Sequence, residues 1–544
     1  MNLKTLRTFL KLGARAQRDG IPQADVLRQE QTVLAALRRL DKRPGILLAD
    51  EVGMGKTYEA LGIAAAVRRA DPDARIVIVT PGPELNAKWA KDIAGFKEMH
   101  DFGSAQVRAA RHLRDFVEAT RTSRIVVAPV TIFRTGRAQE ERACILALYC
   151  RWKGLPHQTV HAVFRRVFPD RRPVPDLDGT PFLGAFGWED LEAHLDSAFG
   201  CNDGSDRRGT LDAIYTHDGI EGFRNGDAVR RGMYHARFAL CAGLLPVIRL
   251  LIVDEAHKLR NPGSLQTSAM RQVFEKRFDK ALLLTATPFQ LDVGELREIF
   301  CLFSQATTAP PDLMGEIDDL LSSINIYQER YDLFQQVWTR LDPLQARAFS
   351  ERYEADGLSA SFEDANLVLV LEHVKALHGL KTATIQPRLR DWMIRSLRPE
   401  KRDYRQGVPQ RVRASGTGVL PFLVYERFIA ELFRQNRPTH KVAAEINMVS
   451  SYAAVAGSAL MTADEALPAS AEEYRDLLRK ILPAGKVASS GHPKVSAVVA
   501  DVLAAVRVKE KTLVFCARTE TIRQLQNEIS HAWEAELVER WRRV

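Results

Sequence analysis

Short apolar runs rich in β-branched residues recur along the first part of the chain, separated by longer stretches with helical periodicity. The runs lie at Ile76–Thr80, Ile125–Ala128, Leu250–Val253 and Leu282–Thr285. Strands of this kind, each followed by a helix, form parallel sheets through right-handed crossovers. The pattern therefore predicts an α/β fold, with one parallel-sheet lobe over residues 25–300.

Other segments do not follow this alternation. Residues 134–249 have a middle part rich in Pro, Gly and Asp, which indicates an insertion on the surface of the lobe. Residues 301–490 show helical periodicity, for example at Ile324–Arg352 and Pro421–Arg434, without a strand-rich run. Residues 1–24 have apolar positions at helical spacing and predict an amphipathic N-terminal helix.

A glycine-bearing loop follows the apolar start of Gly45–Thr57, GILLADEVGMGKT. Its glycines let backbone N–H groups approach phosphate oxygens without a Cβ in the way, the lysine can reach the β- and γ-phosphates, and the threonine hydroxyl can ligate magnesium. Asp50 stands where the strict pattern G-x-x-x-x-G-K-[ST] has its first glycine. The residues predicted to hold the nucleotide are Gly53, Met54, Gly55, Lys56 and Thr57.

An acidic pair follows a second apolar run in LLIVDEAHKLRNPG, which starts at Leu250. At the carboxyl end of a strand in a parallel sheet, Asp254 is placed to hold magnesium and Glu255 to orient or deprotonate the attacking water. The alternative is a helix N-terminus, where acidic side chains are favourable. Downstream of a phosphate-binding loop we favour the catalytic interpretation.

A third run, ALLLTATPFQLDVGEL from Ala281, ends in small hydroxyl residues. Thr285, Ala286 and Thr287 can link the water-activating site to whatever lies across the cleft. The other interpretation is a strand end stopped by proline.

Taken together and in this order, these segments resemble the Swi/Snf-type branch of the superfamily-two helicases, the DNA translocases of chromatin remodellers and their bacterial relatives. DEVGMGKT resembles the family's DEMGLGKT loop, VDEAHKLRNPGS its DEAH box, and LTATPFQ with the following GEL its TATPxQN segment. The resemblance adds His257 to the catalytic set and Gln290 to the coupling segment. Leu27–Gln31 resembles the L-R-x-x-Q element, which makes Gln31 the candidate adenine reader.

The resemblance extends beyond the first lobe. WMIRSLRPEKRDYR from Trp392 is similar to the family's FLLRRxKxDV element, and KTLVFCARTETIRQL from Lys511 to the entry into a second motor lobe, so residues 491–544 are expected to begin that lobe. The DEVG-type loop and Ser450-Ser451 are similar to the bacterial group that includes the RNA-polymerase-recycling ATPase and anti-phage helicases. The resemblance implies RecA-like lobes, a helical protrusion, ATP with Mg²⁺ as cofactors, and double-stranded DNA as partner.

The sequence departs from the family pattern near its end. Family members carry two further motifs, including arginines that complete the ATP site from across the cleft, whereas this sequence ends at Val544 without a match to them. We expect either a longer or split protein, in which another chain or segment supplies the missing second-lobe motifs, or an inactive motor.

Basic residues are concentrated in one segment. The chain has a formal net charge of +9 and a pI of about 9.2, which suits a polyanion-binding surface. Residues 388–413 carry many of its arginines and lysines, and two interpretations are open: a phosphate-tracking surface or a solvated linker. The nucleic-acid candidates within it are Arg395, Arg398, Lys401 and Arg402.

The cysteines and the apolar runs bear on compartment. Six cysteines without a C-x-x-C spacing fit reduced thiols in a cytoplasmic protein. Cys144, Cys150, His157 and His161 are too closely spaced for the usual zinc finger, so we do not favour a metal site there. No apolar run approaches the length of a membrane span, and no membrane partner is expected.

The leading hypothesis is an ATP-dependent motor on double-stranded DNA, in which ATP closes the two lobes and hydrolysis reopens them. One alternative is a nucleotide-gated interaction subunit that binds ATP and holds a partner without turnover. Another is a remodeller of RNA polymerase or of another nucleoprotein complex.

Overall fold

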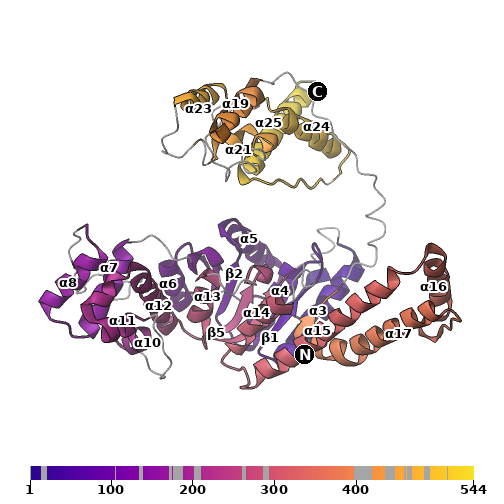
Figure 1. The fold of residues 1–544 in the computed structure, drawn as a ribbon, viewed down its shortest axis with the longest axis horizontal. Helices are drawn as coiled ribbons and strands as arrows, with labels where there is room; N and C mark the ends of the chain where they lie inside the picture. The colour runs from indigo at the N-terminus through magenta and orange to yellow at the C-terminus, as the bar shows by residue number, and fades with distance from the viewer. Residues whose placement is uncertain are drawn as a thin grey trace. The chain divides into compact units, whose positions relative to one another are not determined.

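The computed structural model of the chain describes two compact units, Met1–Pro399 and Glu400–Val544 (Figure 1). The description covers residues 2–13, 21–103, 106–133, 139–170, 174–175, 188–200, 210–259, 265–285, 293–396, 420–434, 447–458, 461, 469–482, 491–510 and 512–543.

A seven-stranded sheet forms the centre of the first unit, in the order β3-β4-β2-β5-β6-β1-β7, and every strand pair in it is parallel. This confirms the predicted α/β fold with a RecA-like parallel-sheet lobe. The strands are β1 (Gly45–Leu48), β2 (Ile76–Thr80), β3 (Val107–Ala109), β4 (Ile125–Pro129), β5 (Ile248–Val253), β6 (Phe278–Leu284) and β7 (Met393–Ile394).

Helices cover both faces of this sheet, which is why β1, β2 and β4 are buried at every position rather than at alternate ones. Ile46 and Leu48 belong to one buried cluster, with α3 (Gln23–Leu40), α4 (Lys56–Ala70) and α5 (Pro83–Met99). Leu47 lies in the other cluster. The helices of that face include α6 (Leu113–Thr122), α13 (Leu265–Phe274) and α14 (Val293–Ser304).

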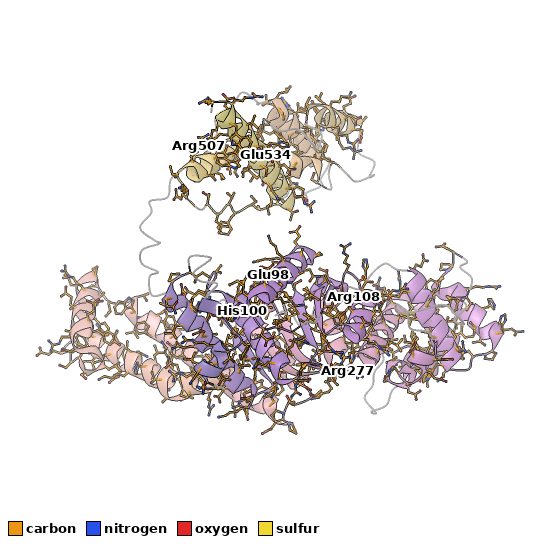
Figure 2. The ribbon with its side chains drawn as sticks, turned by 180° about the vertical axis from the view of Figure 1, so that it is seen from behind. Glu98, His100, Arg108, Arg277, Arg507 and Glu534 are labelled. Atoms are coloured by element: carbon orange, nitrogen blue, oxygen red, sulfur yellow. The ribbon has the colours of Figure 1, made fainter. Side chains whose placement is uncertain are left out.

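The N-terminal segment packs against the first of these faces. It begins with α1 (Leu3–Arg7), and Phe9 and Leu10 are buried beyond it. The Lys11 backbone N–H donates to Nδ1 of His100 at 3.0 Å, just beyond the last residue of α5. Figure 2 labels His100 in the body of the first unit. The apolar positions at the start of the chain therefore cover part of the lobe.

The insertion is helical in its described parts and has no strand there before β5 begins at Ile248. Tyr149, Phe199 and Phe223 pack ring against ring inside it. They belong to the same buried cluster as the strand residue Leu251. The helical elements are α7 (Gln139–Trp152), α8 (His157–Val167), α9 (Trp188–Glu192), α10 (Leu195–Phe199), α11 (Leu211–Asp218), η2 (Gly219–Arg224) and α12 (Gly226–Leu244).

An arm of three helices follows α14 (Figure 1). It consists of α15 (Leu313–Trp338), α16 (Pro343–Asp356) and α17 (Ala365–Gly379), held by their own aromatic cluster. The chain then returns through α18 (Gln386–Trp392) to β7, which pairs with β1. The presence of a strand in this region differs from the helical expectation. The sequence did not predict it because two residues are too few to show a period.

The regular elements of the second unit, where it is described, are helices. Its helices are α19 (Leu420–Arg434), α21 (Tyr452–Ala456), α23 (Ala469–Ile481), α24 (Pro493–Arg507) and α25 (Thr519–Arg542). Residues 512–517, where the resemblance places entry into a second lobe, lie outside any helix or strand. Leu513 and Phe515 are 77% and 88% exposed there. A strand needs a hydrogen-bonded neighbour, and the described part of this unit provides none. No described helix combines the length and apolar character needed to cross a membrane.

Candidate nucleotide site at the carboxyl edge of the sheet

The loop between β1 and α4 has the backbone shape of a phosphate cradle. Gly53 and Gly55 have φ values of 79° and 95°, in the left-handed region that favours glycine. Gly55 is the N-cap of α4, so Lys56 opens a helix whose first N–H groups face the loop. A Cβ on Gly55 would stand 2.3 Å from Nε2 of Gln29. The dihedral angle therefore favours glycine at this position, and any larger residue would also have to displace the Gln29 amide.

The side chain of Lys56 turns back onto its own loop. Its Nζ donates to the carbonyl oxygens of Asp50 at 2.6 Å and Glu51 at 3.1 Å. Burial lowers the pKa of Lys56, and the charges of Asp50, Glu255, Glu59 and Asp254 oppose this shift. The lysine of the loop and the acidic pair after β5 thus lie close enough to interact, although they are far apart in sequence.

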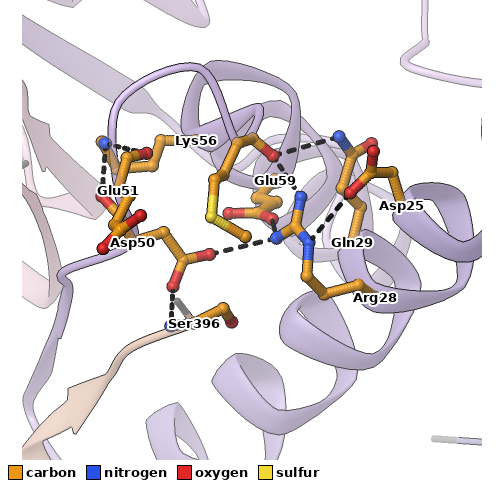
Figure 3. A network of polar contacts seen from close by, with 9 residues as sticks. Asp25, Arg28, Gln29, Asp50, Glu51, Lys56, Glu59 and Ser396 are labelled. Carbon is orange, nitrogen blue, oxygen red and sulfur yellow. Dashed lines mark hydrogen bonds and ion pairs between the residues drawn. The ribbon is translucent and has the colours of Figure 1, made fainter. Parts of the chain in front are cut away.

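A buried ionic network lies beneath the loop (Figure 3). Arg28, on α3, donates to Oδ2 of Asp50 at 3.2 Å and to Oε1 of Glu59 at 2.8 Å, and also to the Met54 carbonyl oxygen. Gln29 donates to the same carbonyl at 3.2 Å. Both carboxylates are fully buried. Burial raises the pKa of Glu59 to about 8, the nearby Asp50 charge adds to this rise, and Arg28 opposes it.

Asp254 is held in place from two sides. Its Oδ2 accepts a hydrogen bond of 2.8 Å from the indole Nε1 of Trp89, a buried residue of α5. Its Oδ1 accepts from the backbone N–H of Glu255 at 2.9 Å. The backbone N–H of Asp254 also donates to Val79, at the end of β2. These bonds fix the carboxylate at the edge of the sheet.

Glu255, His257 and Thr285 form a chain of contacts beside it. Glu255 has a φ of 50°, which an ordinary side chain rarely adopts and which re-aims its carboxylate immediately after the strand. Nδ1 of His257 lies 3.2 Å from Oε2 of Glu255 and 3.4 Å from Oγ1 of Thr285. The backbone N–H of Thr285 donates to Leu48, the last residue of β1. The ends of β5, β6 and β1 are thereby joined.

These residues fit a magnesium-bound triphosphate. The cradle excludes a side chain at Gly55, and a half-buried ammonium lies between carbonyl oxygens that a phosphate can replace. Thr57 is in the first turn of the same helix. Magnesium takes few protein ligands beside phosphate oxygens and water, so one hydroxyl and the Asp254 carboxylate suffice. Among the described residues, no group of three or more His, Cys, Asp or Glu is placed to hold a metal alone.

The structure brings seven of the candidate site residues together at one edge of the sheet: Gly53, Gly55, Lys56, Asp254, Glu255, His257 and Thr285. Their roles stay predictions. Gln31 is exposed on α3, and it is Gln29, two residues earlier, whose amide contacts the loop. The adenine-reading role of Gln31 stays a prediction. Ala286, Thr287 and Gln290 lie outside the described residues, as do Arg398, Lys401 and Arg402. Arg395 is described and exposed.

Sequence reasoning missed three residues of the site. Trp89, Arg28 and Gln29 act through hydrogen bonds to partners at least 22 positions away, which no local pattern reveals. The predicted reduced thiols agree with the five cysteines of the described segments, which are all free.

Comparison with known proteins gives a family match over part of the first unit. Residues 24–143 match the family described as "Type III restriction enzyme, res subunit", and this segment contains the phosphate-binding loop. Among solved structures, the Sulfolobus solfataricus SWI2/SNF2 ATPase core in complex with dsDNA matches with 12% identity and a TM-score of 0.28. That match covers 88% of this chain and 64% of the other protein. This chain therefore spans less than two thirds of the length of the Sulfolobus protein. No curated protein matches the chain.

Proposed function

We propose that this protein is an ATP-dependent translocase on double-stranded DNA, with the nucleotide bound at the β1–α4 loop. The observation that carries the proposal is the convergence of Lys56 with Asp254 and Glu255 at one edge of a parallel sheet. Ligands of such sheets bind beyond the carboxyl ends of the strands. The family matched by residues 24–143 supports a motor of this type.

The residues of the chain divide the work. Lys56 would leave its two carbonyl acceptors and bind the β- and γ-phosphate oxygens, while Thr57 and Asp254 would hold magnesium. When bound, magnesium would neutralise charge on the phosphoryl group that is transferred. Glu255 orients the attacking water, and His257 fixes the Glu255 carboxylate and connects it to Thr285. Ala286, Thr287 and Gln290 would extend this connection toward the DNA.

The DNA part of the proposal rests on the resemblance of the sequence motifs to DNA translocases and on one basic segment. The segment that follows β7 is rich in arginine and lysine, and Arg395, Arg398, Lys401 and Arg402 would contact backbone phosphates there. A cytoplasmic location agrees with the free cysteines.

The test is a comparison of wild type with Lys56→Ala and Glu255→Gln. We expect calorimetry to show Mg-ATP binding that Lys56→Ala weakens and Glu255→Gln retains. With a second motor lobe added, duplex DNA should stimulate ATP hydrolysis by wild type only. In a triplex-displacement assay with the same addition, ATP should release the third strand while a forked duplex stays paired. Equal Mg-ATP affinity of wild type and Lys56→Ala would refute the nucleotide site.

One observation favours a second candidate, the nucleotide-gated interaction subunit. In the described part of the chain, the charges that oppose the lowered pKa of Lys56 come from four carboxylates, and Arg28, the arginine beneath the loop, is paired with two of them. Phosphoryl transfer is faster by about 10³–10⁵ when an arginine stabilises the transition state. We propose that a further segment or partner supplies that arginine. Nucleotide binding without DNA-stimulated turnover, even when a second motor lobe is added, would favour the interaction subunit.

A further inference from the structure

The insertion contains a cavity of its own, of about 550 Å³, between α7, α8, η2 and α12. Each of these four elements contributes one arginine to its wall: Arg142, Arg166, Arg224 and Arg230. The single acidic residue of the wall is Asp227. The cavity is therefore strongly cationic, although it is far in sequence from the basic segment after β7.

Arg142 carries the clearest sign of an absent partner. Its Nε is buried and has no hydrogen-bond acceptor in the described part of the chain. A buried guanidinium N–H without an acceptor is unfavourable, since it has lost water and gained nothing in return. An oxygen of a ligand in the cavity would satisfy it.

The other arginines are paired, but with carboxylates that reach into solvent. Arg166 and Arg224 bind Glu221 at 2.6 and 3.0 Å, and Arg230 binds Asp227 at 2.8 Å. The side chains of Glu221 and Asp227 are 59% and 72% exposed. Exposed ion pairs of this kind contribute little stability. An incoming phosphate, whose oxygens match the guanidinium fork, can replace them at small cost.

The floor of the cavity selects among anionic ligands. Phe168, Phe223 and Met233 close it, but their exposures of 5%, 1% and 2% leave no aromatic face on which a base could stack. The first residues of the 19-residue helix α12, among them Gly226, also line it and add N–H groups to the arginines. The surface offered is one for phosphate, without readout of a base.

We propose that the cavity of the insertion binds phosphodiester groups of a nucleic acid strand, through Arg142 and Arg230 with Arg166 and Arg224 beside them. The choice of nucleic acid as the source of the phosphate rests on the proposed function. A free phosphorylated small molecule would offer the same chemistry. Contact here is independent of base sequence, and it places a second anchor on the DNA outside the motor motifs.

The experiment uses the full chain with Arg142→Gln and Arg230→Gln, and Arg165→Gln as the matched control. Arg165 is an exposed neighbour of Arg166 on α8 and does not line the cavity. Binding of fluorescent DNA is measured by anisotropy over a series of salt concentrations. Each cavity variant should bind severalfold more weakly, with a slope of log affinity against log salt shallower by roughly 0.7–0.9. The control should match wild type. A thermal unfolding temperature equal to that of wild type shows that a variant is folded. If Arg142→Gln proves unfolded, the result for Arg230→Gln decides the test.

A second arm measures pyrophosphate binding by calorimetry, in chains that also carry Lys56→Ala so that the loop after β1 is disabled. Loss of pyrophosphate binding in Arg142→Gln, with unchanged DNA binding, would overturn nucleic acid as the ligand. Unchanged DNA slopes and unchanged pyrophosphate binding would overturn the site itself while leaving the nucleotide site and its Lys56 dependence intact. If wild type binds no DNA, the translocase proposal and the choice of nucleic acid both fall, while the pyrophosphate arm decides whether the cavity takes phosphate.

Discussion

The carboxylate of Asp50 accepts a hydrogen bond of 2.5 Å from the backbone N–H of Ser396, a residue 346 positions later. Asp50 also gives its carbonyl oxygen to Lys56 and its second carboxylate oxygen to Arg28 (Figure 3). Ala49 donates to the carbonyl of Ile394 beside it. The residue that replaces the usual first glycine thus ties the nucleotide loop to the point where the chain leaves β7.

Asp50→Asn should weaken this tie. An amide can offer one oxygen, so either Arg28 or Ser396 would face a second donor, and we expect a loss of about 1–3 kcal/mol in unfolding free energy. Hydrogen–deuterium exchange should show that Mg-ATP changes protection of the Ser396 amide in wild type and not in the variant.

The matched control for this prediction is Asp25→Asn. Asp25 also lies near Arg28, at 3.6 Å, but its side chain is 48% exposed and contacts neither the loop nor Ser396. Asp25→Asn should lower the free energy of unfolding by at most about 1 kcal/mol. If Mg-ATP leaves the exchange of the Ser396 amide unchanged in wild type, the predicted connection between the loop and Ser396 is contradicted.

Trp89→Phe tests the indole that positions Asp254. The ring stays buried but the N–H is lost, and a hydrogen bond to a charged acceptor contributes about 1.5–3 kcal/mol. We expect the magnesium concentration needed for nucleotide binding to rise at least severalfold, with binding of metal-free ATP unchanged, as measured by calorimetry. Trp152→Phe removes a similar indole bond, to Asp196 in the insertion, and should leave the magnesium requirement as it is. The same shift in both variants would count against a positioning role.

Gly55→Ala should disable the loop. At a φ of 95° an L-residue is strained by about 1–2 kcal/mol, and its Cβ would displace the Gln29 amide. We expect Mg-ATP affinity to fall at least about tenfold, since N–H groups no longer converge on the phosphates. Gly95→Ala lies in α5 with open space around it and should be neutral or slightly stabilising. Retained affinity in Gly55→Ala would exclude the phosphate cradle.

A pH-dependent element lies in the second unit at His492. Its buried ring accepts from the Val495 N–H at the start of α24 and bonds the Met448 carbonyl oxygen with Nε2 at 3.0 Å. Only the neutral ring with a proton on Nε2 can do both. Burial lowers the pKa of His492, Lys494 lowers it further, and the Met448 bond and Glu528 oppose this.

The folded state therefore resists protonation. As pH falls below about 6.5 the unfolded chain takes up the proton first, so stability is full above that value and declines as pH falls toward the lowered pKa. Thermal unfolding followed by hydrogen exchange in α24 should show this decline in wild type. His492→Asn keeps a capping acceptor without a titrating group and should flatten it. If the stability of His492→Asn declines as steeply with falling pH, a group other than His492 is responsible for the pH dependence.

The sheet was predictable because β2, β4 and β5 are continuous apolar runs, and their carboxyl-end residues follow directly in the sequence. The residues that orient these side chains could not be predicted from the sequence. Trp89 and Asp254, for example, meet only because α5 packs on the sheet. Likewise, β7 is a strand because it pairs with β1, and its own two residues would not have predicted one. Segment 512–517 has strand-like residues, but pairing depends on a neighbour.

The insertion shares a single apolar core with the sheet, since Phe199 and Phe223 belong to the same cluster as Leu251 and Val253. Its last helix, α12, packs against α13 and leads into β5 through residues 245–247, and Asp254 and Glu255 follow directly after that strand. Removing the insertion would therefore uncover apolar side chains of the shared core, and the solubility of the shortened chain should fall. A shift of α12 caused by a molecule bound to the insertion would reach the start of β5 along the chain itself.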